Sequence, residues 1–561
     1  MKWTCVLLAF ACMAAEPPSK LPAKPSPVLE AMKQELDRSM DQLKKQKTPP
    51  YFLGYDITEV DSVRVAGSFG TLTSSNRQRQ RLLGVDLRAG SYQLDNTRPI
   101  RGSMFNAIDS MSYISMPVED DRDAIRALLW YHTDQKYKRA IEQLIAVTTN
   151  NKVKIEETDR SGDFSPAPAE NYIEPAAPPL KVDQKLWEDK VRKYTAPFQR
   201  YGNIYQARAA LSATTKTRWF VSSDGSVIQT SDTSYQLSIN GFSKADDGME
   251  LPRFETFYSS TLEGLPSDET VLAAVNKIAK DLMALKMAPV MDAYLGPAIL
   301  SGRAAGVFFH EVFGHRIEAQ RQKRDDDGQT FRDKVGKLVL PDFLSVYSDP
   351  TLRKLGKTEL SGAYKFDDQG VKARRVPVVE NGMLKSFLLS RTPLDGFPTS
   401  NGHGRKEPGR LVAARQSNLI VEASKAVSRE ELKKRLIEEV KKANLKYGLL
   451  FEDIMGGFTM VGRASPNAFE VLPVMVYRIY ADGSEELVRG VDVVGTPLTA
   501  FSRILAADDQ VATFNGTCGA ESGMVPVSAN SPGLLIAQLE VQKKPKSTER
   551  SPILGPPFDD R

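Results

Sequence analysis

A short segment, residues 308–318, carries two histidines and two glutamates in the sequence FFHEVFGHRIE. His310 and His315 are five residues apart, and Glu311 directly follows the first histidine. Zinc hydrolases use this set of side chains, but their usual motif places the two histidines four residues apart on one helical face. With 4 His in 561 residues, chance would place a pair at this spacing only about 0.02 times. The segment therefore predicts a metal site.

The spacing of five has a structural consequence. On a regular helix, side chains five residues apart differ in direction by about 140°, against about 40° for side chains four apart. A single π-type turn, whose backbone bonds run from residue i to i+5, would bring His310 and His315 to the same face. Gly314 precedes His315, and glycine tolerates such a distortion best. We therefore expect a locally widened or interrupted helix at the motif.

Two imidazoles and one more protein ligand, with the fourth position left for water, are typical of a catalytic zinc site. The metal lowers the pKa of the water that it binds, and Glu311 is placed to take the proton as the water attacks a carbonyl. Glu311 is thus the candidate general base of a hydrolase. The structural alternative is a pair of histidines packed in a core, with Glu311 facing solvent.

The N-terminal segment predicts export. Residues 1–15 contain a Lys, then about a dozen apolar residues and then small residues, which is the layout of a secretory signal. Cleavage near Ala14 or Ala15 predicts a periplasmic protein, and lipid attachment at Cys12 is the alternative. No later stretch of about twenty apolar residues follows, so we expect no transmembrane segment in the mature chain.

The chain has 3 Cys. Cys5 and Cys12 fall in the signal segment, so Cys518 is left alone and no internal disulfide is possible. A lone thiol in an oxidising compartment is a liability unless it is buried or occupied, for example by a metal. A metal ligand and a buried structural thiol are therefore both open interpretations, and a third is the nucleophile of a thiol hydrolase. Gly516 and Gly519 around it predict a loop that approaches other backbone closely.

The length indicates two or more domains, since 561 residues are too many for one core. A Pro-rich connector over residues 16–27 leads into an N-terminal α/β domain over residues 28–290. This domain opens with an amphipathic helix that ends before Pro49-Pro50. A Pro- and Ala-rich stretch near residues 160–180 predicts a linker or long loop.

Residues 291–542 are expected to form a C-terminal metallopeptidase domain that is dominated by antiparallel β-sheet and contains the motif helix. Turn pairs between β-prone runs predict three hairpins, at Asp224-Gly225, Asn381-Gly382 and Asp482-Gly483. A capping box at Ser428 predicts a helix that closes at Gly448. Residues 543–561 are charged and Pro-rich, which predicts a disordered tail. The expected fold class is α+β.

Charge argues against nucleic acid as a partner. The chain has 75 Lys and Arg against 70 Asp and Glu, a formal net charge of only +5. No dense basic run is interleaved with aromatic residues, as a nucleic-acid footprint would require.

Together these residues resemble the TldD/PmbA family of zinc peptidases, in the branch that carries a His-Glu-x-x-x-His pattern. The segment HEVFGHRIE fits that family as a unit, and four further stretches are similar to it, at residues 366–371, 378–387, 401–405 and 518–527. The resemblance implies that Cys518 is the third zinc ligand, beside His310 and His315. Glu318 is a candidate partner for the free ring N–H of a ligand histidine.

Two loop residues are candidates for substrate contact. His403 lies in a Gly-x-Gly loop, where it could line the cleft, contact substrate or serve loop structure alone. Arg405 matches the family loop and could hold a peptide carboxylate or carbonyl, or lie in solvent.

The resemblance also implies a dimer, with a second copy or with a family member, that encloses a chamber where unfolded, extended peptides are cut. The leading hypothesis is an exported zinc-dependent peptidase. The alternative is a zinc-holding but non-catalytic peptide-binding or partner subunit of a TldD/PmbA-type complex. The intact Glu311 favours the peptidase.

Overall fold

The structure is a computed structural model that describes residues 26–100, 113–151, 159–324, 327–459, 461–462, 469–545 and 552. The expected signal segment, nearly all of the connector and most of the expected tail lie outside these residues. Among the helices of the described part, none combines the length and apolar character that a membrane span needs.

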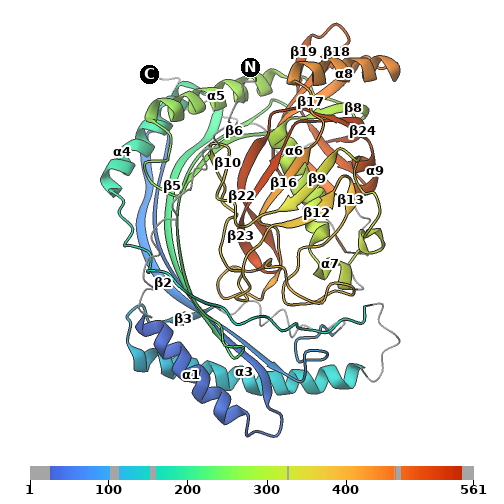
Figure 1. The fold of residues 1–561 in the computed structure, drawn as a ribbon. Helices are drawn as coiled ribbons and strands as arrows, with labels where there is room; N and C mark the ends of the chain where they lie inside the picture. Colours follow the sequence, from blue (N-terminus) through green and yellow to red (C-terminus); the bar gives the residue numbers. More distant parts are fainter. Residues whose placement is uncertain are drawn as a thin grey trace, which may run out of the picture.

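The N-terminal half is built on a seven-stranded sheet of order β3-β2-β1-β5-β6-β4, with β7 also paired to β6. Neighbouring strands in this sheet are antiparallel, except that β4 and β6 are parallel. The strands are β1 (Pro50–Ser68), β2 (Thr71–Ala89), β3 (Ile114–Met116), β4 (Asn171–Ile173), β5 (Ile204–Ser222), β6 (Val227–Lys244) and β7 (Glu250–Ser259). Figure 1 shows the long strands curving around the C-terminal half, which lies on their concave side.

Four helices cover the outer side of this sheet (Figure 1). Helices α1 (Pro27–Leu43) and α3 (Arg122–Asn151) pack together at one end, and α4 (Gln184–Thr195) and α5 (Asp268–Met287) lie at the other, with a 3₁₀ turn (Ala196–Arg200) after α4. Ser26 caps α1 by accepting a hydrogen bond from the backbone of Leu29 at 3.3 Å. The apolar stripe of α1, including Met32 and Leu36, is buried as its spacing predicted.

The Pro- and Ala-rich stretch near residues 160–180 is extended, but it is not a free linker. Phe164 is buried, and its ring lies 3.7 Å from the guanidinium carbon of Arg88 and 3.9 Å from that of Arg391. Arg391 belongs to the C-terminal half, and its Nε donates to the carbonyl of Ser165 at 2.8 Å. Through these contacts the stretch stabilises the interface between the two halves.

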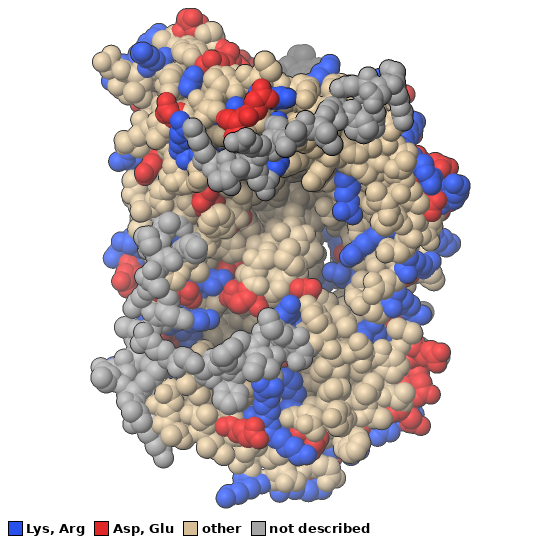
Figure 2. Space-filling model, turned by 180° about the vertical axis from the view of Figure 1, so that it is seen from behind, with Lys and Arg blue, Asp and Glu red and all other residues tan. Residues whose placement is uncertain are grey.

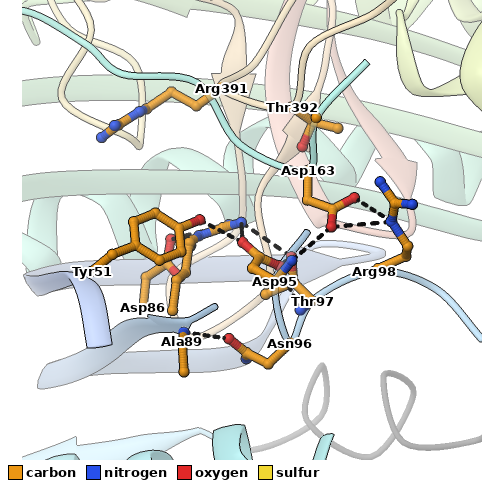
Figure 3. Close-up of polar contacts among 12 residues, drawn as sticks. Tyr51, Asp86, Ala89, Asp95, Asn96, Thr97, Arg98, Asp163, Arg391 and Thr392 are labelled. Carbon is orange, nitrogen blue, oxygen red and sulfur yellow. Dashed lines mark hydrogen bonds and ion pairs between the residues drawn. The ribbon is translucent and has the colours of Figure 1, made fainter. Parts of the chain in front are cut away.

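A polar network supports this junction from the N-terminal side (Figure 3). Asp163 accepts hydrogen bonds from the backbone N–H of Asp95 at 2.9 Å and from Nε of Arg98 at 2.9 Å. The fully buried carboxylate of Asp95 accepts in turn from the hydroxyl of Tyr51 at 2.6 Å and from Nη1 of Arg88 at 3.2 Å. Buried charges of this kind are tolerated because each has a partner.

The C-terminal half contains two larger sheets. One has the order β13-β12-β9-β16-β23-β22, with strands β9 (Leu344–Ser348), β12 (Val376–Glu380), β13 (Met383–Leu384), β16 (Asn418–Ala423), β22 (Ala512–Ala520) and β23 (Gly523–Ser531). The other has the order β17-β8-β24-β20-β18-β19 with β21 beside β24, and its strands are β8 (Tyr294–Leu300), β17 (Tyr447–Thr459), β18 (Phe469–Tyr480), β19 (Glu485–Val488), β20 (Val491–Gly495), β21 (Ile504–Ala507) and β24 (Leu534–Lys543).

Smaller elements complete this half: β10 (Lys354–Leu355), β11 (Thr358–Glu359), β14 (Gly404–Arg405), β15 (Ala413–Ala414), α7 (Gln320–Lys323), α8 (Arg429–Lys442), α9 (Pro497–Ser502) and a 3₁₀ turn (Arg332–Lys334). Most strand pairs are antiparallel, which confirms the α+β class. All three predicted turn pairs connect consecutive antiparallel strands, so these hairpins are also confirmed.

One helix boundary was predicted wrongly. Ser428 caps α8 by accepting from the backbone of Glu431, as expected. The helix ends at Lys442, however, and Gly448 lies in β17. Asn444 takes a left-handed backbone conformation, with φ of 52°, and stops the helix there.

Candidate metal centre

The motif helix lies in the apolar core of the C-terminal half, where α6 (Gly302–Phe308) contacts β17 in one sheet and β22 and β23 in the other. Ser301 caps its first turn. The helix then widens into a π turn (Phe309–Phe313) and ends in a 3₁₀ turn (Gly314–Ile317). This confirms the predicted distortion, and it places the ring centroids of His310 and His315 only 5.1 Å apart.

Gly314 is needed for a reason that the spacing did not reveal. Its φ of −59° and ψ of −45° are open to any residue. A side chain there would overlap the amide group of Gln416, which packs directly on this backbone. The same amide donates to the carbonyl of His310 at 3.1 Å and so holds the widened turn.

Cys518 meets the two histidines from β22. It lies in the hairpin with β23, opposite Val525, so the predicted loop is wrong at this position. Its Sγ is 3.4 Å from Nε2 of His315, and the candidate ligand atoms of His310, His315 and Cys518 all lie within 4.8 Å of one another. Sulfur and nitrogen bound to one tetrahedral zinc would be about 3.5 Å apart, given bond lengths of about 2.3 and 2.1 Å.

The environment of this cluster fits a cation. The three side chains are buried, and Nδ1 of His310 is a buried ring nitrogen without a hydrogen-bond partner in the described structure. Burial alone would raise the pKa of the Cys518 thiol, but the imidazoles of His310 and His315 outweigh it and hold that pKa well below its ordinary value. A thiolate with two imidazoles is a common donor set for zinc.

Glu318 orients one of these rings. Its carboxylate is fully buried and lies 3.2 Å from Nδ1 of His315. Because Nδ1 then carries the proton, Nε2 is free to face Cys518. Burial would raise the pKa of Glu318, but His315, Arg321 and Arg415 together lower it to about 2.

Arg415 is a site residue that sequence analysis missed. It is fully buried, and its Nε lies 3.4 Å from the Glu318 carboxylate. Its Nη2 donates to the backbone carbonyl of Cys518 at 2.8 Å. The guanidinium of Arg415 therefore links Glu318, which contacts His315, to the backbone of Cys518. No spacing in the sequence marks this residue, because the link joins positions about a hundred residues apart.

Glu311 stands beside the cluster. Its carboxylate is 3.8 Å from Nε2 of His315, and its side chain is only 12% exposed. Burial raises its pKa. Glu311 also lines the cavity that opens beside the three candidate ligands. A carboxylate in this place can take and return a proton during hydrolysis.

The cavity has a volume of about 500 Å³. Residues 455–459 of β17 form one wall, and residues 516–520 of β22, with Glu521 in the turn that follows, form another. Seen from behind the view of Figure 1, the molecule is hollowed between its two halves, and Lys and Arg alternate with Asp and Glu over this face (Figure 2).

His403 and Arg405 do not reach this cavity. His403 is fully buried, with Nε2 3.0 Å from the hydroxyl of Ser348 and Nδ1 3.2 Å from the carbonyl of Asn401. Arg405 donates to the carbonyl of Gln416 at 2.6 Å. Loop structure, one of the roles left open for His403, is what its contacts show, and Arg405 is buried rather than in solvent.

Comparison with known proteins agrees with the sequence motif. Residues 294–543 match the family described as the PmbA/TldA metallopeptidase C-terminal domain. A metalloprotease of Methanocaldococcus jannaschii is 28% identical over 230 residues, which are 41% of this chain and 47% of the relative. A zinc metalloprotease TldD homolog of Saccharolobus solfataricus is 25% identical over 253 residues, 44% of this chain and 51% of the relative. The matches thus span about half the length of these curated relatives.

The fold is also shared. The crystal structure of TldE from Thermococcus kodakarensis superposes on this chain with a TM-score of 0.59 at 12% identity. The superposition covers 91% of this chain and 100% of TldE. At that identity the likeness concerns the fold alone. Motif, domain match and relatives agree, and residues 294–543 of this chain belong to the TldD/PmbA family as its metallopeptidase C-terminal domain.

Proposed function

We propose that this protein is a zinc-dependent peptidase that hydrolyses peptide bonds in unfolded or extended peptides. The observation that carries the proposal is the convergence of His310, His315 and Cys518 beside Glu311 in the wall of a cavity. Zinc, when bound by the two imidazoles and the thiolate, would polarise a carbonyl and make water more acidic.

The residues of the chain have distinct parts in this reaction. Glu311 accepts the proton of the attacking water and transfers it to the leaving amine. The raised pKa of its buried carboxylate makes it a stronger base than a free glutamate. Glu318 keeps the His315 ring in the tautomer whose Nε2 faces the cluster.

The cavity walls support an extended peptide as substrate. β22 is the last strand of its sheet, and its residues 516–520 line the cavity. In β17, only residues 449–451 pair with β8, so in the described structure residues 454–459 have β18 on one side alone. Free strand edges bind an extended peptide through its backbone, whatever its sequence.

The test separates catalysis from metal binding. Glu311→Gln should keep one equivalent of zinc and lose about 10²-fold to 10⁴-fold in the cleavage of a denatured protein substrate. Glu438→Gln, an exposed glutamate on α8, is the matched control and should behave as wild type. Full activity of Glu311→Gln would refute the assignment of the base. A zinc-loaded wild-type protein that binds peptides but cuts none would favour the non-catalytic subunit.

A second candidate is supported by one specific geometry. Sγ of Cys518 is 3.4 Å from His315, whose other nitrogen is held by Glu318, and this is also the arrangement of a cysteine hydrolase. It leaves His310 and Glu311 without a role, so we place it second. Elemental analysis decides: Cys518→Ala should lose the equivalent of zinc that wild type carries, whereas a metal-free, active wild-type protein would support the thiol mechanism.

Location and assembly belong to the proposal as well. The layout of residues 1–15 supports export to the periplasm. The fold shared with TldE supports assembly with a second copy or with a family member. Size-exclusion chromatography with light scattering, on protein recovered from the periplasmic fraction, tests both.

A further inference from the structure

Two rows of side chains run away from the metal centre on facing elements. On the motif helix, Arg303, Val307 and Glu311 follow one another at steps of four and share a face. On β22, Phe514, Gly516 and Cys518 follow at steps of two and share a face. Successive members of the helix row are about 6 Å apart, and successive members of the strand row are about 6.7 Å apart. Each member of one row can therefore face the corresponding member of the other.

Contacts at both ends fix this correspondence. At the near end, Glu311 stands beside the cluster that Cys518 completes. At the far end, the guanidinium of Arg303 lies over the ring of Phe514, 5.5 Å from its centroid. Val307 and Gly516 are the middle members of the two rows, and both line the cavity. The ring of Phe514 lies over Gly516, where a Cβ would meet it at 2.7 Å, so ring, valine and glycine together line one hollow of the cavity.

The floor and the end of this hollow are apolar. Val527 and Ala529 of β23 pair with Gly516 and Phe514, line the cavity, and are only 4% and 1% exposed. We call the five residues Val307, Phe514, Gly516, Val527 and Ala529 the Phe514 subsite. None of them carries a charge.

The charged side chain at its far end is not free to meet a ligand. Arg303 lies 3.0 Å from the carboxylate of Glu255 and 3.2 Å from that of Asp453. The charge of Arg303 is therefore balanced by these carboxylates, and its guanidinium covers the Phe514 ring at the far end of the subsite.

The cavity has the opposite character on the other side of the metal centre. There Glu521 lines the wall and lies 2.6 Å from Nη2 of Arg321, which also lines the cavity. A peptide that passes the cluster therefore meets an apolar hollow on one side and an ion pair on the other. Such asymmetry distinguishes residues on the two sides of the scissile bond.

We infer that the Phe514 subsite binds a large apolar side chain, aliphatic or aromatic, that flanks the bond to be cut. This inference rests on the proposed peptidase function and deepens it, because backbone binding alone would give no preference. The cavity of about 500 Å³ that these residues line has room for a side chain of the size of Leu or Phe. Burial of that side chain removes it from water without leaving a polar group unpaired.

The experiment uses peptides that differ at one residue, with cleavage sites read by mass spectrometry. In wild type, kcat/KM for Leu or Phe at the position next to the cut should exceed that for Ser or Asp by about 10-fold or more. Gly516→Val should push the Phe514 ring into the cavity, since a Cβ there would meet that ring at 2.7 Å, and should reduce this ratio towards one.

The matched control adds the same side chain to the opposite wall. Gly456 lines the cavity from β17, and a Cβ there meets nothing within 4 Å. Gly456→Val should keep the apolar preference. Phe514→Ala is a second variant, which lengthens the hollow and should shift the preference towards Trp. Equal kcat/KM for Leu and Ser peptides in wild type would overturn the inference while leaving the peptidase assignment intact.

Binding keeps the inference testable even if no peptide is cut. The Glu311→Gln variant, loaded with zinc, is titrated with fluorescent Leu and Ser peptides. Tighter binding of the Leu peptide, lost in the double variant with Gly516→Val, would support the Phe514 subsite. Equal affinities would refute it. Absence of cleavage by wild type would count against the proposed function alone.

Discussion

The fully buried carboxylate of Glu318 lies 3.2 Å from Nδ1 of His315, on the side of the ring that faces away from Cys518. A ligand histidine held in this way has one tautomer and one orientation. The orientation of His315 for metal binding therefore depends on Glu318, a residue that touches no substrate.

Glu318→Gln should weaken zinc binding by about 10-fold to 100-fold, because the amide keeps the shape but not the charge that supports the ring. Competition with a chromophoric chelator measures the affinity. Glu521→Gln is a suitable control, since Glu521 is near the cavity but contacts neither histidine. Equal zinc affinity in Glu318→Gln and wild type would show that His315 needs no such partner.

Gly314→Ala should disturb the metal centre through packing alone. The new Cβ would overlap the Gln416 amide and displace its hydrogen bond to the carbonyl of His310. We expect a loss of zinc affinity together with a destabilisation of about 1–3 kcal/mol, as for other overpacked sites. Chelator competition and thermal unfolding are the measurements.

The double variant Gly314→Ala with Gln416→Ala checks this reason. Removal of the Gln416 amide relieves the overlap, so the destabilisation by Gly314→Ala should be smaller in that background. An unchanged effect would point to the backbone of the π turn instead.

The sequence predicted the geometry of the metal motif, but it did not predict the residues that hold the motif in place. A spacing of five between His310 and His315 is incompatible with one helical face, so the π turn followed from the sequence. Arg415 and Gln416 carry no comparable signal, since their roles come from contacts with residues distant in the chain. The sequence around Cys518 reads as a glycine-rich loop, but pairing with β23 turns it into a strand. Tertiary contacts of this kind override local preference.

Phe164→Ala should loosen the junction between the two halves. The ring is 2% exposed and is stacked by two guanidinium groups. Its removal should cost about 3 kcal/mol or more, from lost burial and lost cation–π contacts. Denaturant unfolding measures this, and Phe458→Ala, at a ring that is 47% exposed, should change stability by less than about 0.5 kcal/mol. Equal effects of the two variants would show that Phe164 does not hold the halves together.

His403 should make the protein sensitive to acid. Burial, with Arg405 and Arg374 adding to it, lowers the pKa of His403 to about 3, whereas an unfolded chain has a pKa of about 6.5. Above pH 6.5 neither state binds the proton. Between about pH 6.5 and 3 only the unfolded state does, so the free energy of unfolding should fall by about 1.4 kcal/mol per pH unit from this residue.

The variant His403→Gln isolates that contribution. Its amide can replace some of the hydrogen bonds to Ser348 and Asn401, but it cannot bind the proton. Unfolding free energy measured from pH 7 to 4 should therefore decline less steeply in the variant, by about 1.4 kcal/mol per unit. His132→Gln, at a partly buried ring on α3, should change the slope less. Parallel declines in wild type and His403→Gln would mean that the buried imidazole is protonated in place, with Ser348 or Asn401 rearranging to accept its second proton.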